Sequence, residues 1–134
     1  MPGSQLSESQ SASDQPKVVL VVDDELLILE LAEQVLERAG YRVVARASGS
    51  EAVDVVREQR VDIAVVDLNM PTPNGWETLA ALHEVDPDLP VLMASGFGSD
   101  EEARERGALG LLEKPYSAAK LRSVVASMLE QHGR

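Results

Sequence analysis

The sequence contains no cysteine, only four aromatic residues and no long run of apolar residues. Without cysteine, the chain has no disulfide bridges, thiolate metal sites or cysteine nucleophile, which excludes a small secreted fold stabilised by disulfides. No stretch approaches the roughly 18 consecutive apolar residues of a membrane-spanning helix. We therefore expect no membrane association.

Basic residues are scarce as well. Twelve Lys and Arg stand against 23 Asp and Glu, so the formal net charge is −11. Proteins that bind nucleic acid directly use clustered Lys and Arg together with aromatic rings that stack on bases. We therefore expect no direct contact with nucleic acid.

Residues 1–16 contain five Ser, three Gln and two Pro, and their only apolar side chains are those of Met1, Leu6 and Ala12. So few apolar groups cannot offset the entropy of ordering the segment. The segment also lacks Lys, Arg and the apolar centre of a secretory signal. We interpret residues 1–16 as a flexible tail or linker, assign residues 17–134 to one domain, and expect a cytoplasmic protein.

Five short apolar runs have the length of β-strands. Residues 17–22, 61–66, 89–94 and 109–113 are almost continuously apolar, as is typical of strands covered on both faces. Residues 41–46 carry two arginines on one side, which favours a partly exposed edge strand. Each run precedes a segment with helical features.

Those segments carry the capping residues and the periodicity of helices. Ser48, Asn74 and Ser99 are each followed by Glu three residues later, the pattern of a helix start, and Ser117 precedes the last helix. An apolar stripe predicts the first helix, which ends at Gly40. The stripe consists of Ile28, Leu31, Ala32, Val35, Leu36 and Ala39. The predicted buried face of the last helix consists of Leu121, Val124, Val125, Met128 and Leu129.

Five strands that alternate with five helices predict a parallel sheet with helices on both faces, joined by right-handed crossovers. The second and fifth strands are the ones suited to the edges, because one is of mixed polarity and the other is short. The expected fold is therefore a doubly wound, flavodoxin-like (βα)5 domain of the α/β class with strand order 2-1-3-4-5.

Polar residues follow four of these strands and should meet at one edge of the sheet. In chain order they are Asp23, Asp24 and Glu25, then Asp67, then Ser95, and finally Lys114 with Pro115. Ionised carboxylates about 4 Å apart repel each other by roughly 4 kcal/mol at an effective dielectric constant of 20. Asp23, Asp24 and Asp67 therefore need compensating cations. Lys114 supplies one charge, and oxygen ligands without His or Cys indicate Mg²⁺ as the other cation.

Four motifs at these positions resemble those of the receiver domain of two-component response regulators. They are VLVVDDE, DLNMP, ASG and EKPY, and they begin at residues 19, 67, 94 and 113. Each motif alone is weak, but all four occur in the family's order and spacing. The resemblance covers the chain from Lys17 to its C-terminus.

The resemblance implies a chemistry for the acidic cluster. Asp67 would be the phosphoryl acceptor, a carboxylate nucleophile that takes the group from a sensor histidine kinase or a histidine phosphotransfer protein. Asp23, Asp24 and Asp67, with the backbone carbonyl of Asn69, would hold the Mg²⁺. The protein would then be a regulatory phosphoprotein that catalyses only its own phosphorylation and dephosphorylation.

The resemblance also implies a switch. Lys114 would be the second cation, and the hydroxyl of Ser95 would move toward the phosphoryl group and draw its loop along. A downstream protein would bind the fourth helix, the fifth strand and the fifth helix. The fourth helix, which begins after Ser99, has little apolar anchor and should be weakly docked. One departure is Leu111, which stands where the family usually has an aromatic residue that moves with the hydroxyl.

Several alternatives remain. A Mg²⁺-dependent phosphohydrolase of the haloacid dehalogenase type would need a second Asp two residues after the nucleophile, where this chain has Asn69. A nucleotide-binding module would need a glycine-rich loop in place of Asp23 to Glu25. A docking module that is never phosphorylated would not need the acceptor, the metal pair, the hydroxyl and the Lys. We expect no output domain after the last helix, so the chain would act as a stand-alone regulator or as the receiver of a hybrid kinase.

Overall fold

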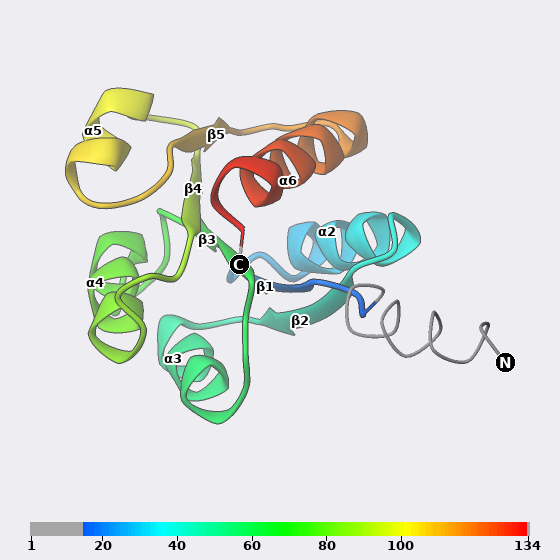
Figure 1. Cartoon of the computed structure of the whole chain (residues 1–134). Helices are drawn as coiled ribbons and strands as arrows, with labels where there is room; N and C mark the ends of the chain where they lie inside the picture. Colours follow the sequence, from blue (N-terminus) through cyan, green and yellow to red (C-terminus); the bar gives the residue numbers. More distant parts are fainter. Residues whose placement is uncertain (1–14, 134) are drawn as a thin grey trace, which may run out of the picture.

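The computed structural model describes residues 15–133, so the predicted tail at 1–16 lies almost wholly outside the described residues. Within them, five strands alternate with five helices (Figure 1). The strands are β1 (Val18–Val22), β2 (Arg42–Arg46), β3 (Ile63–Asp67), β4 (Val91–Ser95) and β5 (Leu111–Glu113). The helices are α2 (Leu26–Arg38), α3 (Gly49–Glu58), α4 (Gly75–Val85), α5 (Asp100–Glu105) and α6 (Ala118–His132).

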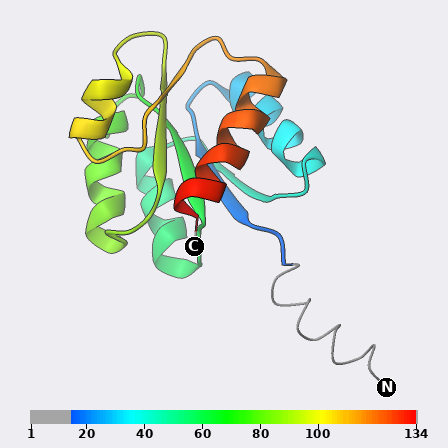
Figure 2. The same ribbon diagram turned by 45° about the horizontal axis from the view of Figure 1, so that its top comes forward.

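All neighbouring strands are parallel, and their order is β2-β1-β3-β4-β5. The predicted doubly wound fold, the strand order and both edge strands are therefore confirmed. Helices α2 and α6 cover one face of the sheet, and α3, α4 and α5 cover the other (Figures 1 and 2). Among residues 15–133, none of the helices has the length and apolar character needed to cross a membrane.

The central strands are buried on both faces, which explains their continuous apolar sequence. In β1, Leu20 and Val22 pack with residues of α3, α4 and α5, whereas Val19 and Val21 pack with residues of α2 and α6. Burial of each such side chain stabilises the fold by about 1.5–3 kcal/mol. This packing holds the carboxyl ends of β1, β3 and β4 at fixed positions relative to one another.

The predicted capping residues start the helices. The side chains of Ser48, Ser99 and Ser117 each accept a hydrogen bond from the backbone N–H three residues later. Asn74 and Glu77 form a complete capping box, in which each side chain bonds the backbone of the other residue. Gly40, with φ of 100°, follows α2 as predicted, in a conformation that favours glycine.

The predicted apolar stripe of α2 is partly wrong. The helix buries Leu29, Ala32, Val35 and Leu36, while Leu31 is 56% exposed and Ala39 is exposed. The first turns of α2 carry leucine or isoleucine on every side, so periodicity alone does not select the face that contacts the sheet. For α6 the prediction is confirmed, because Leu121 and Val125 are buried and Val124, Met128 and Leu129 pack against the same core.

Candidate functional site

The carboxyl ends of the strands bring the predicted polar residues together. Asp23 follows β1, Asp67 ends β3, Ser95 ends β4 and Lys114 follows β5. The first three are at most 3% exposed, and the Lys114 side chain is 13% exposed. Four chain segments far apart in sequence thus supply one buried polar site.

Lys114 lies between the carboxylates. Its Nζ is 2.9 Å from Oδ2 of Asp23, 3.2 Å from Oδ1 of Asp67 and 3.7 Å from Oε1 of Glu25. The backbone N–H of Asn69 donates a second hydrogen bond to Oδ1 of Asp67, at 3.3 Å. Oδ1 of Asp67 is therefore held by two donors, whereas no described residue donates a hydrogen bond to its Oδ2.

Burial and charge shift three pKa values at this site. Desolvation raises the pKa of Asp23, although the hydrogen bond from Lys114 partly opposes it. Desolvation acts to lower the pKa of Lys114, but the hydrogen bond and the charge of Asp23, together with the charge of Asp67, outweigh it and raise that pKa. The pKa of Tyr116 is raised by burial first and by the charge of Asp23 second. The site thus favours a charged lysine and penalises excess negative charge.

The acidic residues nearest one another are not quite those predicted. Carboxylate oxygens of Asp23, Glu25 and Asp67 lie within 4.8 Å of each other, whereas Asp24 is outside this group; the side chains of Asp24 and Glu25 are both exposed. The backbone N–H of Glu25 bonds to Oδ1 of Asp23 at 2.9 Å, and the 63% exposed Glu25 side chain reaches the rim of the pocket, with Oε1 3.7 Å from Nζ of Lys114. The sequence showed three consecutive acids but not which of them lie near Asp67.

This group of oxygens fits a hard divalent cation. Three carboxylates against the single ammonium of Lys114 leave a formal charge of −2 in the pocket. Carboxylate oxygens without nitrogen or sulfur ligands are the donor set that Mg²⁺ accepts. Both the charge and the ligand type of the described residues therefore suit this ion.

Ser95 is fully buried at the end of β4. Its Oγ accepts a hydrogen bond from the backbone N–H of Phe97 at 3.0 Å, which leaves its own O–H as a donor. Its carbonyl accepts a bond from the backbone N–H of Lys114 at 2.8 Å. The loop after β4 is thus connected to the segment that carries the lysine.

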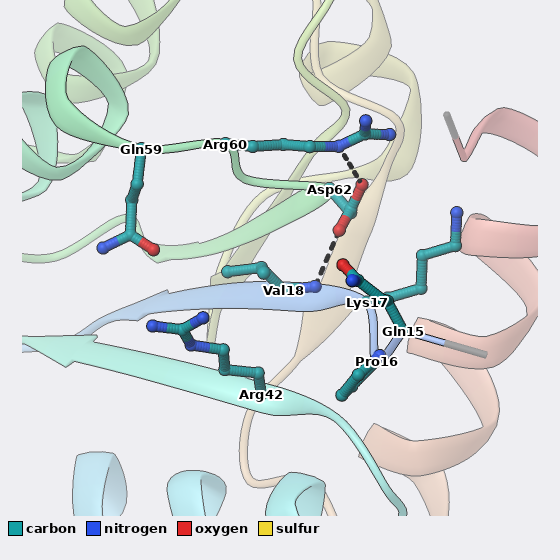
Figure 3. Close-up of a pocket in the computed structure, with 8 residues that line it drawn as sticks. All are labelled: Gln15, Pro16, Lys17, Val18, Arg42, Gln59, Arg60 and Asp62. Carbon is teal, nitrogen blue, oxygen red and sulfur yellow. Dashed lines mark hydrogen bonds and ion pairs between the residues drawn. The ribbon is translucent and has the colours of Figure 1, made fainter. Parts of the chain in front are cut away.

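A second charged cluster lies at the amino ends of β1, β2 and β3, opposite the candidate site, around a hollow of about 400 Å³ (Figure 3). The buried carboxylate of Asp62 accepts a hydrogen bond from the backbone N–H of Val18 at 2.7 Å and contacts Arg60 Nε at 3.0 Å. The backbone N–H of Asp62 bonds to the carbonyl of Val18 at 2.8 Å. Asp62 therefore holds the beginning of β1 beside β3 and has a structural role.

Known proteins resemble this chain over the same region. Residues 19–126 match the family model described as the response regulator receiver domain. The chain is 30% identical over 114 residues to sporulation initiation phosphotransferase F of Bacillus subtilis, covering 83% of this chain and 92% of that protein. It is 36% identical over 118 residues to the transcriptional regulatory protein PrrA of Mycobacterium tuberculosis, covering 86% of this chain and 51% of that protein. The chain thus spans about half the length of PrrA.

Solved structures agree with these matches. The chemotaxis response regulator CheY4 of Vibrio cholerae superposes with a TM-score of 0.80 at 31% identity, and the alignment covers 86% of this chain and 100% of CheY4. Sequence, fold and the position of the acidic site thus lead to one assignment. The chain belongs to the response regulator receiver domain family, the receivers of two-component signalling.

Proposed function

We propose that Asp67 accepts a phosphoryl group through its Oδ2 atom. The observation that carries the proposal is the asymmetry of this carboxylate, since Lys114 and the backbone of Asn69 both bind Oδ1. In the transfer, the bond between phosphorus and an imidazole nitrogen of the donor breaks and a bond from phosphorus to Oδ2 forms. The imidazole nitrogen keeps the electron pair and takes up a proton.

Lys114 has two tasks in this proposal. Before transfer it orients the acceptor through Oδ1 of Asp67 and neutralises part of the charge of Asp23. During transfer its ammonium faces the negative charge that spreads over the phosphoryl oxygens. Because the Lys114 side chain is largely buried, its charge acts with little screening by water.

We further propose that Mg²⁺ binds this pocket and, when bound, neutralises the charge that develops on the phosphoryl oxygens. Asp23 and Asp67 would be two of its ligands. The third carboxylate would be Glu25, whose exposed side chain already lies near the other two, or Asp24, which the sequence predicted and which would have to turn toward them. The carbonyl of Asn69 remains a predicted ligand.

Ser95 would convert the modification into a change of shape. Its O–H can donate to a phosphoryl oxygen on Asp67 if the hydroxyl moves toward it, and the loop after β4 would follow. The elements that this loop connects are β4 and α5, and β5 lies directly beside β4. We therefore propose α5, β5 and α6 as the surface that a downstream protein reads.

The proposed donors are a sensor histidine kinase or a histidine phosphotransfer protein, in the cytoplasm. The phosphotransferase named among the relatives supports a relay role, and the transcriptional regulators support control of an output by contact. A role as a haloacid dehalogenase-type phosphohydrolase is not favoured, because Asn69 stands where that chemistry needs a second Asp.

The direct test is incubation with acetyl phosphate and Mg²⁺, followed by intact mass measurement. We expect one added phosphoryl group in the natural chain, none in Asp67→Asn and none when a chelator removes Mg²⁺. The exposed Asp88→Asn is the matched control and should be modified like the natural chain. An adduct of equal yield in Asp67→Asn would contradict the assignment of the acceptor, and no adduct in the natural chain would favour a docking module.

A further inference from the structure

Helix α5 is fastened mainly by polar contacts. It has six residues, and Ala103 is its only buried one, in line with the weak docking predicted from the sequence. Its remaining attachments involve charged side chains, among them Arg106, whose guanidinium lies 4.5 Å from the centre of the Trp76 ring on α4. An element held in this way can change position without uncovering a large apolar surface.

The most specific of these attachments joins the first residue of α5 to the first residue of β5. Oδ1 of Asp100 accepts a hydrogen bond from the backbone N–H of Leu111 at 2.8 Å. This N–H faces the free edge of the sheet, since β5 pairs only with β4 and the backbone groups of Gly110 and Lys114 are the ones bonded to β4. The Asp100 side chain therefore supplies the hydrogen-bond acceptor that a further strand would supply at this edge.

Arg104 and Gly110 also contribute to this contact. Arg104 Nη2 pairs with Oδ2 of Asp100 at 2.8 Å, and Arg104 Nε donates to the carbonyl of Leu109 at 3.1 Å. A Cβ atom at Gly110 would lie 2.5 Å from Oδ1 of Asp100, so the carboxylate occupies the space that any larger residue would need. We call the contact between Asp100, Arg104 and the backbone at 109–111 the α5–β5 latch.

The α5–β5 latch lies close in the chain to Ser95, whose hydroxyl is part of the proposed switch. Asp100 follows Ser95 by five residues, and Leu111 precedes Lys114 by three. Ser95 and Lys114 are bonded through their backbones at the carboxyl end of β5, and the latch binds the other end of the same short strand. A shift of Ser95 therefore displaces the segment that follows it in the chain. The next contact of that segment with β5 is the hydrogen bond of Asp100.

We propose that Asp100 is the positioning residue that couples Ser95 to β5 in this chain, where residue 111 is a leucine and cannot report the switch as an aromatic ring. The inference rests on the proposed phosphorylation of Asp67. Movement of Ser95 toward the phosphoryl group displaces the start of α5, and the bond from Leu111 N–H to Asp100 opens. Because the Asp100 side chain is 53% exposed, water replaces the lost partner at little cost.

The latch makes the backbone amide of Leu111 a direct reporter. Its hydrogen exchange is measured by NMR in the full chain, before and after treatment with acetyl phosphate and Mg²⁺, and the mass of every sample is recorded. In the natural chain we expect exchange to accelerate about fivefold to tenfold on phosphorylation, as one hydrogen bond opens. In Asp100→Ala we expect fast exchange in both states with an unchanged yield of phosphoryl adduct.

Three variants separate coupling from a loss of fold. Asp100→Asn keeps an acceptor oxygen and should restore the slow, phosphorylation-dependent exchange of Leu111. Gly110→Ala should reproduce Asp100→Ala, because its methyl group displaces the carboxylate without changing charge. Glu101→Ala removes an exposed acid from the same helical turn and should behave like the natural chain.

Two outcomes would overturn the inference in distinguishable ways. If the natural chain gains a phosphoryl group but the exchange of Leu111 does not change, the latch does not couple the site to β5, while the proposed function stands. If the natural chain gains no phosphoryl group, the proposed function fails, and the coupling fails with it.

Discussion

At the scale of single residues, charge balance decides the character of the site. Among residues 15–133, Lys114 is the one cation whose contacts reach Asp23, Glu25 and Asp67. Since its pKa is raised above 10.5, its stabilisation of the fold is complete at neutral pH and is lost only as the pH rises past that raised pKa. Lys114 therefore keeps its positive charge throughout the physiological range.

The identity of the third metal ligand can be tested residue by residue. If Glu25 is the ligand, Glu25→Gln should weaken Mg²⁺ binding by about tenfold, and Asp24→Asn should change it by less than about threefold, because only Glu25 lies with the other carboxylates. Isothermal titration with Mg²⁺ measures both. The reverse order of effects would show that Asp24 turns inward to bind the ion, as the sequence predicted.

The sequence predicted which residues gather at this edge, because the carboxyl ends of parallel strands must meet. Asp23, Asp67, Ser95 and Lys114 were placed together on that argument alone, and the structure brings them together. The position of the Glu25 carboxylate near Asp23 and Asp67 could not be predicted, since it depends on a hydrogen bond from its backbone to the side chain of Asp23.

At the scale of elements, the start of β1 depends on Asp62. Replacement by alanine leaves the backbone N–H of Val18 without its partner, so Asp62→Ala should lower the free energy of unfolding by about 1–3 kcal/mol. Urea denaturation measures this change. Arg60→Ala should cost less than about 1 kcal/mol, because the Arg60 side chain is 64% exposed in its ion pair. Equal losses in the two variants would mean that the ion pair, not the backbone bond, stabilises β1.

The helices show which element-level predictions could succeed. Helix starts follow from local hydrogen bonds between a cap and the residue three positions later, so Ser48, Asn74, Ser99 and Ser117 identified them correctly. The buried face of α2 follows instead from its contact with the sheet. Because Leu26, Leu27 and Leu31 are as apolar as the residues that are buried, the sequence pattern did not distinguish them.

At the scale of the whole molecule, the buried charge that the proposed function needs lowers the stability of the fold. The raised pKa of Asp23 means that its ionised form disfavours folding; this penalty is complete above that pKa, decreases as the pH falls below it, and is gone below the ordinary pKa of 3.8. In a chelator at pH 7, Asp23→Asn should therefore raise the free energy of unfolding, by on the order of 1 kcal/mol. Urea denaturation across the acid range measures the effect.

The pH dependence supplies the control. The difference between the natural chain and Asp23→Asn should shrink as the pH falls below the raised pKa of Asp23 and vanish below its ordinary pKa of 3.8, where the carboxyl group is neutral in the folded and the unfolded chain. Added Mg²⁺ should stabilise the natural chain more than the variant. A variant less stable than the natural chain at neutral pH without metal would mean that the ion pair with Lys114 outweighs the burial of Asp23.

The amino-acid sequence was sufficient to predict the number and order of strands and helices, the edges of the sheet and the residues that gather at its carboxyl edge. These follow from alternation, hydrophobicity and capping, which act between residues close together in the chain. Three features required the packed molecule: the buried face of α2, the acid that lies with Asp23 and Asp67, and the binding position of the Asp100 carboxylate. Each of these depends on a contact between particular atoms, and such contacts exist only after the segments have packed.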